Sequence, residues 1–240
     1  KNPVGGHKNA AYAGMIESLD DSIGAVQATL KRLKLEENTV VIFFSDNGGH
    51  GGVTSNAPLR GSKGMLYEGG IREPLVVKWP GVTKLGTVCN EPVVGADLYP
   101  TFLEMTGAKR PKNYQLDGLS IAPLLRDSTA SLDRAALYRH FPCYLQGYTP
   151  RHGPFRTTPA AAIRMGDLKL VEFFEDGKLE LYNLKSDLSE KNNLAQKMPA
   201  KTKELHAAML KWRKSVKAPV PTEKNSLYDP KSVFKPRGRK

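Results

Sequence analysis

Cysteine, acidic residues and long apolar runs are all scarce in this sequence. The 240 residues include two cysteines, Cys89 and Cys143, which say little about the redox compartment. We predict that both are free, buried thiols, with a disulfide between them as the alternative. No apolar run is long enough to span a bilayer, and no RNA-recognition signature or zinc finger is present. We therefore predict neither a membrane span nor a nucleic-acid partner.

Acidic residues are outnumbered by basic ones. The chain has 24 Asp and Glu against 36 Lys and Arg, which gives a net charge of +12 and a pI near 9.6. A basic surface attracts polyanions, among them nucleic acid, anionic lipid and sulfated sugars. The alternative is that the charge only keeps the protein soluble. The hydrophobic share of 40% is compatible with a core, and the length allows one large domain or two small ones.

An acidic pair directly follows a short apolar run. Residues Val40–Phe44 are β-branched or aromatic, and glycines follow closely, a pattern typical of a buried strand. Asp46 and Asn47 then fall at the end of that strand, where open α/β sheets place their sites. One charged and one neutral oxygen ligand suit Ca²⁺ or Mg²⁺ better than zinc. Asp-Asn-Gly is also a common turn, and a plain turn is the alternative.

A long glycine-rich segment comes next, from Gly48 to Gly70. Arg60 and Lys63 lie within it, and Arg72 follows just after it. Long loops of this kind in a compact domain are usually functional or disordered. Several cations beside a metal-binding strand end would form a cradle for an anion. The alternative is a solvated basic loop.

Apolar periodicity predicts an α/β region followed by a small antiparallel sheet. The predicted helices are 9–35, 96–106, 120–125 and 201–216, and the predicted strands are 39–45, 75–79, 137–141, 160–164, 168–174 and 179–182. Asn9 is placed to cap the first helix, and Asp176-Gly177 predicts a hairpin turn. Asp20 and Asp21 lie inside the first helix, so we expect solvated carboxylates there rather than metal ligands.

The same pattern divides the chain into three parts. Residues 1–127 form part of an α/β domain, and residues 128–216 form a small subdomain of antiparallel strands and one helix. Residues 217–240 are basic and proline-rich and read as an extended segment or a loose tail.

Three motifs together carry a resemblance to a known family. They are residues 45–49 (Ser-Asp-Asn-Gly-Gly), 59–64 (Leu-Arg-Gly-Ser-Lys-Gly) and 67–74 (Tyr-Glu-Gly-Gly-Ile-Arg-Glu-Pro). They resemble the second half of the formylglycine-dependent sulfatases, which belong to the alkaline-phosphatase superfamily. Residues 12–24, 95–101 and 181–184 also fit this family. The resemblance implies part of an alkaline-phosphatase-like mixed sheet flanked by helices, followed by a small C-terminal antiparallel sheet with one packed helix.

The resemblance assigns roles to three residues. Asp46 and Asn47 match ligands of a divalent cation, Ca²⁺ in the family and sometimes Mg²⁺, although a full oxygen shell needs ligands that this chain lacks. Lys63 lies 17 residues after Asp46, a separation that fits the family's sulfate-binding lysine. Its ammonium group suits a tetrahedral oxyanion and could stabilise charge on the departing alkoxide.

Three further residues are candidates for contacts with the substrate. Arg60 could contact sulfate or hold its loop to a carboxylate. His50 could line the pocket, or it could be a loop histidine without a role. His140 could project from the C-terminal sheet toward the substrate. Arg72 reads as a structural residue.

The family's nucleophile motif is absent from this sequence. Sulfatases carry Cys-x-Pro-x-Arg or Ser-x-Pro-x-Arg, whose first residue is oxidised to formylglycine, and neither Cys89 nor Cys143 opens such a motif. The resemblance therefore implies the C-terminal part of a longer sulfatase, with the formylglycine expected upstream. We expect the chain alone to be inactive.

The predicted function is the hydrolysis of a sulfuric ester. The charge of +12 favours a sulfated carbohydrate as substrate over a small aryl sulfate. One alternative is a phosphodiesterase or phosphonate hydrolase of the same superfamily, and another is a non-catalytic protein that binds sulfated glycans. The family also implies a periplasmic or extracellular location, with any signal peptide upstream of Lys1.

Overall fold

The computed structural model describes residues 7–145, 157–226 and 228. The chain forms two compact units. The first, here the N-terminal unit, comprises residues 14–44 and 74–134. The second, here the C-terminal unit, comprises residues 1–13, 45–73 and 135–240. The predicted division, with boundaries at residues 127 and 216, uses continuous segments of the chain, and it stays a prediction.

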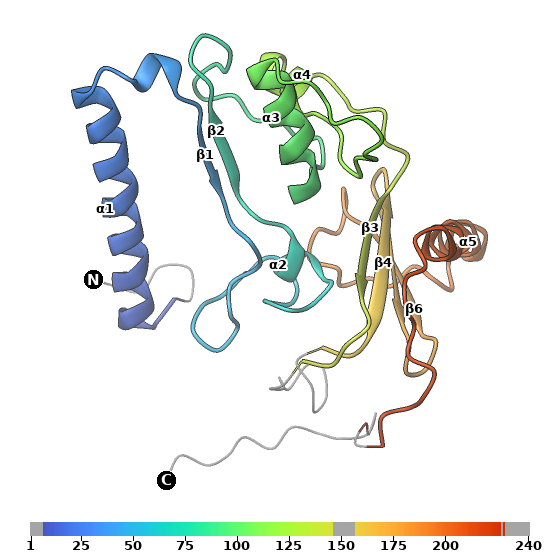
Figure 1. The fold of residues 1–240 in the computed structure, drawn as a ribbon. Coiled ribbons are helices and arrows are strands. Elements are labelled where there is room, and N and C mark those ends of the chain that lie inside the picture. The colour runs from blue at the N-terminus through green and yellow to red at the C-terminus, as the bar shows by residue number, and fades with distance from the viewer. Residues whose placement is uncertain (1–6, 146–156, 227, 229–240) are drawn as a thin grey trace. The chain divides into compact units, whose positions relative to one another are not determined.

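The N-terminal unit contains a two-stranded sheet and several helices (Figure 1). Its elements are α1 (Ala10–Arg32, which begins in the other unit), the 3₁₀ turn η1 (Glu36–Asn38), β1 (Val41–Phe44), β2 (Leu75–Lys78), the 3₁₀ turn η2 (Gly95–Asp97), α3 (Leu98–Thr106) and α4 (Ala122–Arg126). The backbone N–H of Tyr12 donates to Asn9 Oδ1 at 3.0 Å, which confirms the predicted N-cap of α1.

Strand β1 is less buried than its sequence predicts. It pairs antiparallel with β2, with Phe43 opposite Val76. Phe43 and Phe44 keep 36% and 41% of their surface exposed. Within the described residues no other strand pairs with β1, and an apolar strand becomes buried on both faces only where other elements cover both faces. The prediction of a buried strand is therefore wrong for this chain.

The start of α3 is organised around a fully buried carboxylate. Asp97 Oδ2 accepts the backbone N–H of Val94 at 2.8 Å, and Asp97 Oδ1 accepts that of Leu119 at 2.9 Å. The Arg134 guanidinium lies 2.5 Å from Oδ1. Pro100 falls in the first turn of α3, where its missing N–H costs no helical hydrogen bond.

The C-terminal unit is built on a four-stranded antiparallel sheet in the order β3-β4-β5-β6. The strands are β3 (Leu137–Phe141), β4 (Ala160–Met165), β5 (Leu168–Phe173) and β6 (Leu179–Asn183), and the helices are the short α2 (Glu68–Ile71) and α5 (Pro199–Ser215). Between β5 and β6, Gly177 takes a φ of 68°, and the backbone N–H of Lys178 donates to Asp176 at 3.0 Å. The predicted hairpin turn is therefore confirmed.

The two faces of this sheet carry different layers. Helix α5 packs on one face, where Leu205 and Met209 join Ile163, Leu170 and Leu181 in one apolar cluster. Side chains alternate between faces along a strand, so the neighbouring residues point to the other face. There Tyr182 and Leu184 pack with Met65 and Tyr67, two residues of the glycine-rich segment. The face of the sheet opposite α5 thus packs against that segment.

The fold class agrees with the prediction of a mixed α/β protein with a separate antiparallel sheet and one packed helix. Cys89 and Cys143 are both free, as predicted, but they are exposed rather than buried. Both lie outside the helices and strands, where their side chains stay accessible to solvent. Among the described residues no helix is long and apolar enough to cross a membrane.

Candidate active site

The predicted metal pair lies directly after β1. Asp46 is exposed and Asn47 is half-buried. The Asn47 amide nitrogen donates to the Gly48 carbonyl at 3.4 Å, which leaves the amide oxygen as the side chain's acceptor. The Ser45 hydroxyl donates to the Asn47 carbonyl at 3.2 Å, so the backbone of the pair is fixed by its own neighbours.

Asn56 joins the segment of the predicted metal pair to the loop that carries Lys63. Its amide nitrogen donates to the carbonyls of Gly49 and Gly61, at 2.9 and 3.2 Å. Its amide oxygen accepts the N–H of Gly49 at 3.0 Å. One side chain therefore joins two backbone segments that are 12 residues apart in the sequence. This role of Asn56 was not predicted, because an Asn in a polar loop gives no signal of its own.

Glycine is required where these segments meet. The Gly48 N–H donates to the Gly70 carbonyl at 3.2 Å. A Cβ atom on Gly48 would overlap the carbonyl of Gly69, and one on Gly70 would overlap that of Met65. These contacts are with backbone atoms, which cannot move aside as a flexible side chain can. The glycines of the motifs therefore permit the close approach of two loops.

Lys63 stands on the loop that these contacts hold. It is exposed and lies between Gly61 and Gly64, whose φ angles are 83° and 88°, a backbone region that favours glycine. The Lys63 N–H donates to the Gly49 carbonyl at 3.2 Å. The structure thus brings the backbones of the predicted sulfate-binding lysine and of the predicted metal pair together.

Glu73 is a carboxylate near this pair that sequence analysis did not single out. Burial raises the pKa of Glu73, the Ser45 hydroxyl lowers it, and the negative charge of Asp46 raises it again. One of its oxygens, Oε1, is buried without a hydrogen-bond partner in the described structure. Its place directly before Pro74 gave no indication of this position.

Arg60 lies against the C-terminal sheet. Its guanidinium carbon is 3.8 Å from the centre of the Tyr67 ring. It donates to the Tyr182 hydroxyl at 2.8 Å and to the Glu190 carbonyl at 2.9 Å, and it lies 3.8 Å from Glu180. These contacts favour the structural alternative, in which Arg60 holds its loop to a carboxylate. Its contact with substrate stays a prediction.

The two candidate histidines lie in different surroundings. His50 is exposed, and its Nδ1 accepts the N–H of Gly52 at 3.1 Å. His140 lies on β3, with Nε2 2.6 Å from the carbonyl of Pro219 and its ring edge-on to Trp212. His140 therefore ties the segment after α5 to the sheet, and substrate contacts by either histidine stay predictions.

The donor chemistry at Asp46 and Asn47 fits a hard divalent cation, but the pair supplies only part of a site. Ca²⁺ takes about six to eight oxygen ligands. In the part of the chain that the structure describes, no group of three or more His, Cys, Asp or Glu side chains could hold a metal ion. Asp46 and Asn47 can therefore contribute two oxygen ligands to a cation site, and this pair alone does not complete its oxygen shell.

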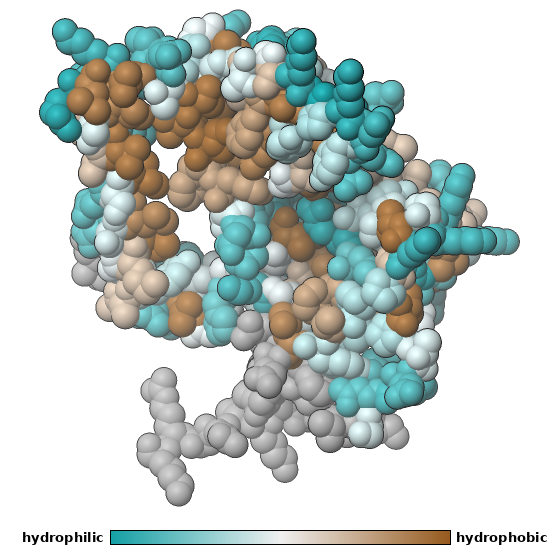
Figure 2. All heavy atoms as spheres, in the orientation of Figure 1, coloured by the Kyte–Doolittle hydropathy of each residue, from teal (hydrophilic) through white to brown (hydrophobic). Residues whose placement is uncertain are grey.

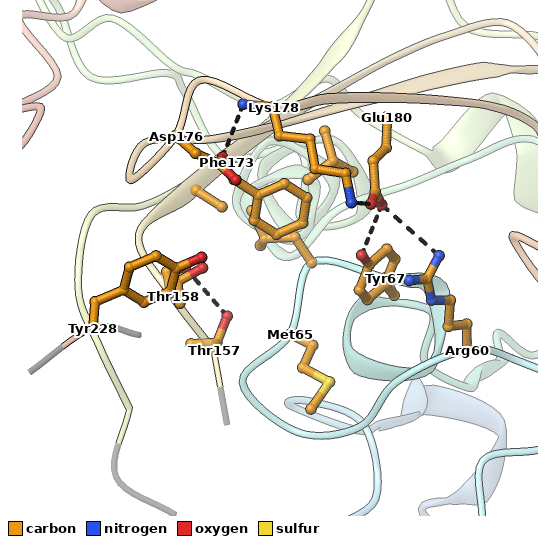
Figure 3. Close-up of a pocket in the computed structure, with 13 residues that line it drawn as sticks. Arg60, Met65, Tyr67, Thr157, Thr158, Phe173, Asp176, Lys178, Glu180 and Tyr228 are labelled. Atoms are coloured by element: carbon orange, nitrogen blue, oxygen red, sulfur yellow. Dashed lines mark hydrogen bonds and ion pairs between the residues drawn. The ribbon is translucent and has the colours of Figure 1, made fainter. Parts of the chain in front are cut away.

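A cavity of about 180 Å³ lies between the Lys63 loop and the sheet (Figure 3). Arg60, Tyr67 and Glu180 lie together on one side, and Thr157 and Tyr228 lie on the other. The charged residues of the lining balance: two are basic (Arg60, Lys178) and two acidic (Asp176, Glu180), and Lys63 is not among them. The cavity thus lacks the positive excess expected of a sulfate site, and of the predicted cradle cations only Arg60 is among its lining residues.

The buried ion pairs beside the loop that carries Lys63 were also not predicted. Lys169 Nζ lies 2.8 Å from Glu68 Oε1 and 2.9 Å from Glu190 Oε1, and all three side chains are buried. The only signal was a charged residue inside a predicted strand, at Lys169. Its partners lie 101 residues earlier and 21 later in the sequence, so the sequence pattern could not identify them.

Comparison with protein families gives two matches that together span most of the chain. A family described as N-sulphoglucosamine sulphohydrolase, C-terminal, matches residues 62–215. A family described as Sulfatase matches residues 4–108, which include both segments of the candidate site.

Individual relatives agree with these matches. A protein named Sulfatase from Formosa agariphila is 41% identical over 211 residues, which are 81% of this chain and 37% of that protein. An N-acetylglucosamine-6-O-sulfatase from Bacteroides thetaiotaomicron is 28% identical over 226 residues, which are 90% of this chain and 37% of that protein.

A solved structure gives the same result at the level of the fold. The crystal structure of Ps i-CgsB in complex with k-i-k-neocarrahexaose superposes with a TM-score of 0.72 and 31% identity, over 85% of this chain and 44% of that one. The chain thus spans less than half the length of each of these proteins.

Proposed function

The chain belongs to the sulfatase family, and from that premise we propose that the whole protein hydrolyses sulfuric esters of carbohydrates. Two of these proteins, the N-acetylglucosamine-6-O-sulfatase and Ps i-CgsB in complex with k-i-k-neocarrahexaose, support a carbohydrate substrate. The net charge of +12 agrees with a polyanionic substrate. We also expect export to the periplasm or the cell exterior.

One observation carries the proposal. The Lys63 N–H donates to the carbonyl of Gly49, two residues after Asn47, so the backbone of an exposed lysine is held close to the predicted cation ligands. A sulfate ester needs both kinds of group, because negative charge on its oxygens must be neutralised while the ester oxygen departs. This arrangement favours ester hydrolysis over simple binding of a sulfated chain.

Each residue of this chain would have a defined task. Lys63 would donate to a sulfate oxygen and stabilise charge on the departing alkoxide. Asp46 and Asn47 would offer oxygen ligands, and Asn56 would keep the two loops at a fixed separation. A divalent cation, Ca²⁺ or Mg²⁺, would supply Lewis-acid neutralisation of sulfate charge when bound. The nucleophile, a formylglycine, is expected in a part of the protein outside this chain, which should therefore be inactive by itself.

The test uses the full-length protein, produced together with a formylglycine-generating enzyme. Sulfate release from sulfated oligosaccharides is measured with Ca²⁺ and with a chelator, for the wild type and for Lys63→Ala and Asp46→Ala. We expect Ca²⁺-dependent release that each substitution lowers by at least about 10²-fold, in line with the loss of one charge-stabilising group. Lys203→Ala, an exposed lysine on α5, is the matched control and should keep full activity.

Three outcomes would contradict the proposal in different ways. Release that is insensitive to both substitutions would mean that the active site lies elsewhere. Hydrolysis of a phosphonate ester without release of sulfate would favour the related hydrolase. Tight binding of sulfated glycans without any turnover, in protein with verified formylglycine, would favour a binding protein.

A further inference from the structure

We propose that Glu190 is a positioning residue for the loop that carries Lys63, because it holds both ends of that loop at once. The proposal rests on the proposed function, in that Lys63 is taken to contact sulfate. Glu190 lies after β6, in a segment that none of the sequence motifs of the family resemblance includes.

The carboxylate of Glu190 holds the C-terminal end of the loop, at Glu68. Its Oε2 accepts the backbone N–H of Glu68 at 2.7 Å, the first residue of α2. Its Oε1 lies 2.9 Å from the ammonium of Lys169, which also pairs with the Glu68 side chain at 2.8 Å. Glu190 and Lys169 are 0% and 1% exposed, so water does not compete for these contacts.

The backbone carbonyl of Glu190 holds the N-terminal end of the loop, at Arg60. Its carbonyl accepts a hydrogen bond from the Arg60 guanidinium at 2.9 Å. Arg60 lies against the Tyr67 ring and also donates to Tyr182; Figure 3 shows Arg60 and Tyr67 side by side beneath Glu180. The same residue thus contacts position 60 through its carbonyl and position 68 through its carboxylate.

Lys63 lies between these two anchors. The base of the loop is closed by the Gly69 N–H, which donates to the Arg60 carbonyl at 2.7 Å. Met65 and Tyr67 pack on the sheet. The loop that carries the exposed lysine is therefore held at both ends and by its contact with the sheet. A group that must meet one oxygen of a substrate benefits from such fixation, because small displacements lower catalysis strongly.

The backbone of Glu190 supports this role. Its φ is 51°, a left-handed conformation that is unfavourable for a residue other than glycine, Asn or Asp. Residues in such conformations persist only where their surroundings hold them, and they cluster at functional sites. This φ lets one residue direct its carbonyl to Arg60 and its carboxylate to Glu68.

The test separates the two anchors in the full-length enzyme. Glu190→Gly deletes the carboxylate but keeps the carbonyl and suits the left-handed backbone, and Arg60→Gln weakens the other anchor. We expect each to lower kcat/KM for sulfate release by about tenfold or more and to weaken inhibition by inorganic sulfate similarly. Glu204→Gln, in an exposed ion pair on α5, is the control and should change neither.

A cycle with Lys63→Ala distinguishes positioning from general stability. If Glu190 acts through Lys63, adding Glu190→Gly to Lys63→Ala should cause less than about a twofold further loss. Losses that multiply in the double variant would overturn the proposal. Cooperative thermal unfolding of each variant checks that the fold persists, and Glu190→Gln, which keeps the side chain's shape, replaces Glu190→Gly if that variant does not fold.

A second readout needs no activity, so failure of the proposed function stays distinguishable. Amide hydrogen exchange of residues 61–67 should accelerate in Glu190→Gly, while exchange in α5, on the opposite face of the sheet, stays as in the wild type. Unchanged exchange in 61–67 would overturn the positioning role whatever the enzyme's activity. Accelerated exchange in a protein that releases no sulfate would uphold the loop anchor and reject the sulfatase proposal.

Discussion

Glu180 is a buried carboxylate whose partners keep it ionised. Both the Tyr67 and the Tyr182 hydroxyls donate to its Oε2 at 2.7 Å, and Lys178 lies 2.7 Å from Oε1. Burial alone would raise the pKa of Glu180, but the hydrogen bonds from Lys178, Tyr182 and Tyr67 outweigh it, so the pKa lies below the ordinary value of 4.5. The folded state therefore favours the ionised form of Glu180.

A pH dependence of stability follows from this shift. A carboxylate with a lowered pKa stabilises the fold fully above the pKa of the unfolded chain, and this stabilisation is lost as pH falls through the folded pKa. We expect Glu180→Gln to lower the free energy of unfolding by about 3 kcal/mol at pH 7 and by less below pH 4. Urea unfolding at pH 7, 5, 4 and 3 measures this, with Glu204→Gln as the exposed control. A loss that is equal at every pH would contradict it.

Asp97 is a fully buried carboxylate in the N-terminal unit. Its buried carboxylate accepts two backbone N–H groups and pairs with Arg134. We expect Asp97→Asn to lower the free energy of unfolding by about 3–5 kcal/mol, because the amide cannot serve all of these donors and leaves Arg134 uncompensated. The exposed Asp133→Asn is the matched control. Equal unfolding midpoints in urea for the two variants would show that the Asp97 contacts contribute little.

At the scale of the elements, the effect of replacing a glycine by alanine on stability depends on whether the glycine lies at a close backbone contact or inside a helix. Gly48 leaves no space for a Cβ because the Gly69 carbonyl lies against it, whereas Gly24, inside α1, has nothing within 4 Å. We expect Gly48→Ala to lower the free energy of unfolding by more than about 1 kcal/mol through strain. Gly24→Ala should raise it by about 0.5–1 kcal/mol, as Ala replaces Gly within a helix.

Thermal unfolding of both variants checks this prediction, and sulfate release in the full-length enzyme adds a second measure. Gly48→Ala should also reduce activity, since Gly48 lies between the predicted metal pair and the Lys63 loop, while Gly24→Ala should leave it unchanged. A stable and fully active Gly48→Ala would mean that the two loops can separate without consequence.

The elements themselves were largely predictable from the sequence, because they depend on local patterns. Apolar periodicity placed α5 and the four strands of the C-terminal sheet to within a few residues, and Asp176-Gly177 marked the hairpin. The contacts that build the site depend instead on residues far apart. Arg60 and Glu190 are 130 residues apart, and no local pattern links them. The burial of β1 was predicted wrongly, because burial depends on neighbours that a strand's own sequence does not specify.

At the scale of the molecule, the exposed apolar surface of the N-terminal unit is the feature that most affects behaviour in solution. Helix α1 has no buried residue, and Met15, Val26 and Leu33 each expose about half or more of their surface. Figure 2 shows hydrophobic side chains gathered on the visible face over β1 and β2. Soluble monomers rarely expose contiguous apolar patches of this kind, and such patches promote association.

We therefore expect the 240-residue chain alone to bind a hydrophobic dye such as ANS and to associate as its concentration rises. Phe43 and Val76 lie opposite each other on paired strands, so both point to the same face, with 36% and 62% of their surfaces exposed. Replacing both with Thr keeps β propensity and should reduce dye fluorescence and light scattering. Leu85→Thr, at a fully exposed residue outside the strands, is the control and should change neither. A wild-type chain that stays monomeric without binding dye would show that these side chains do not form a cohesive surface, and the apolar composition of β1 would then need another explanation.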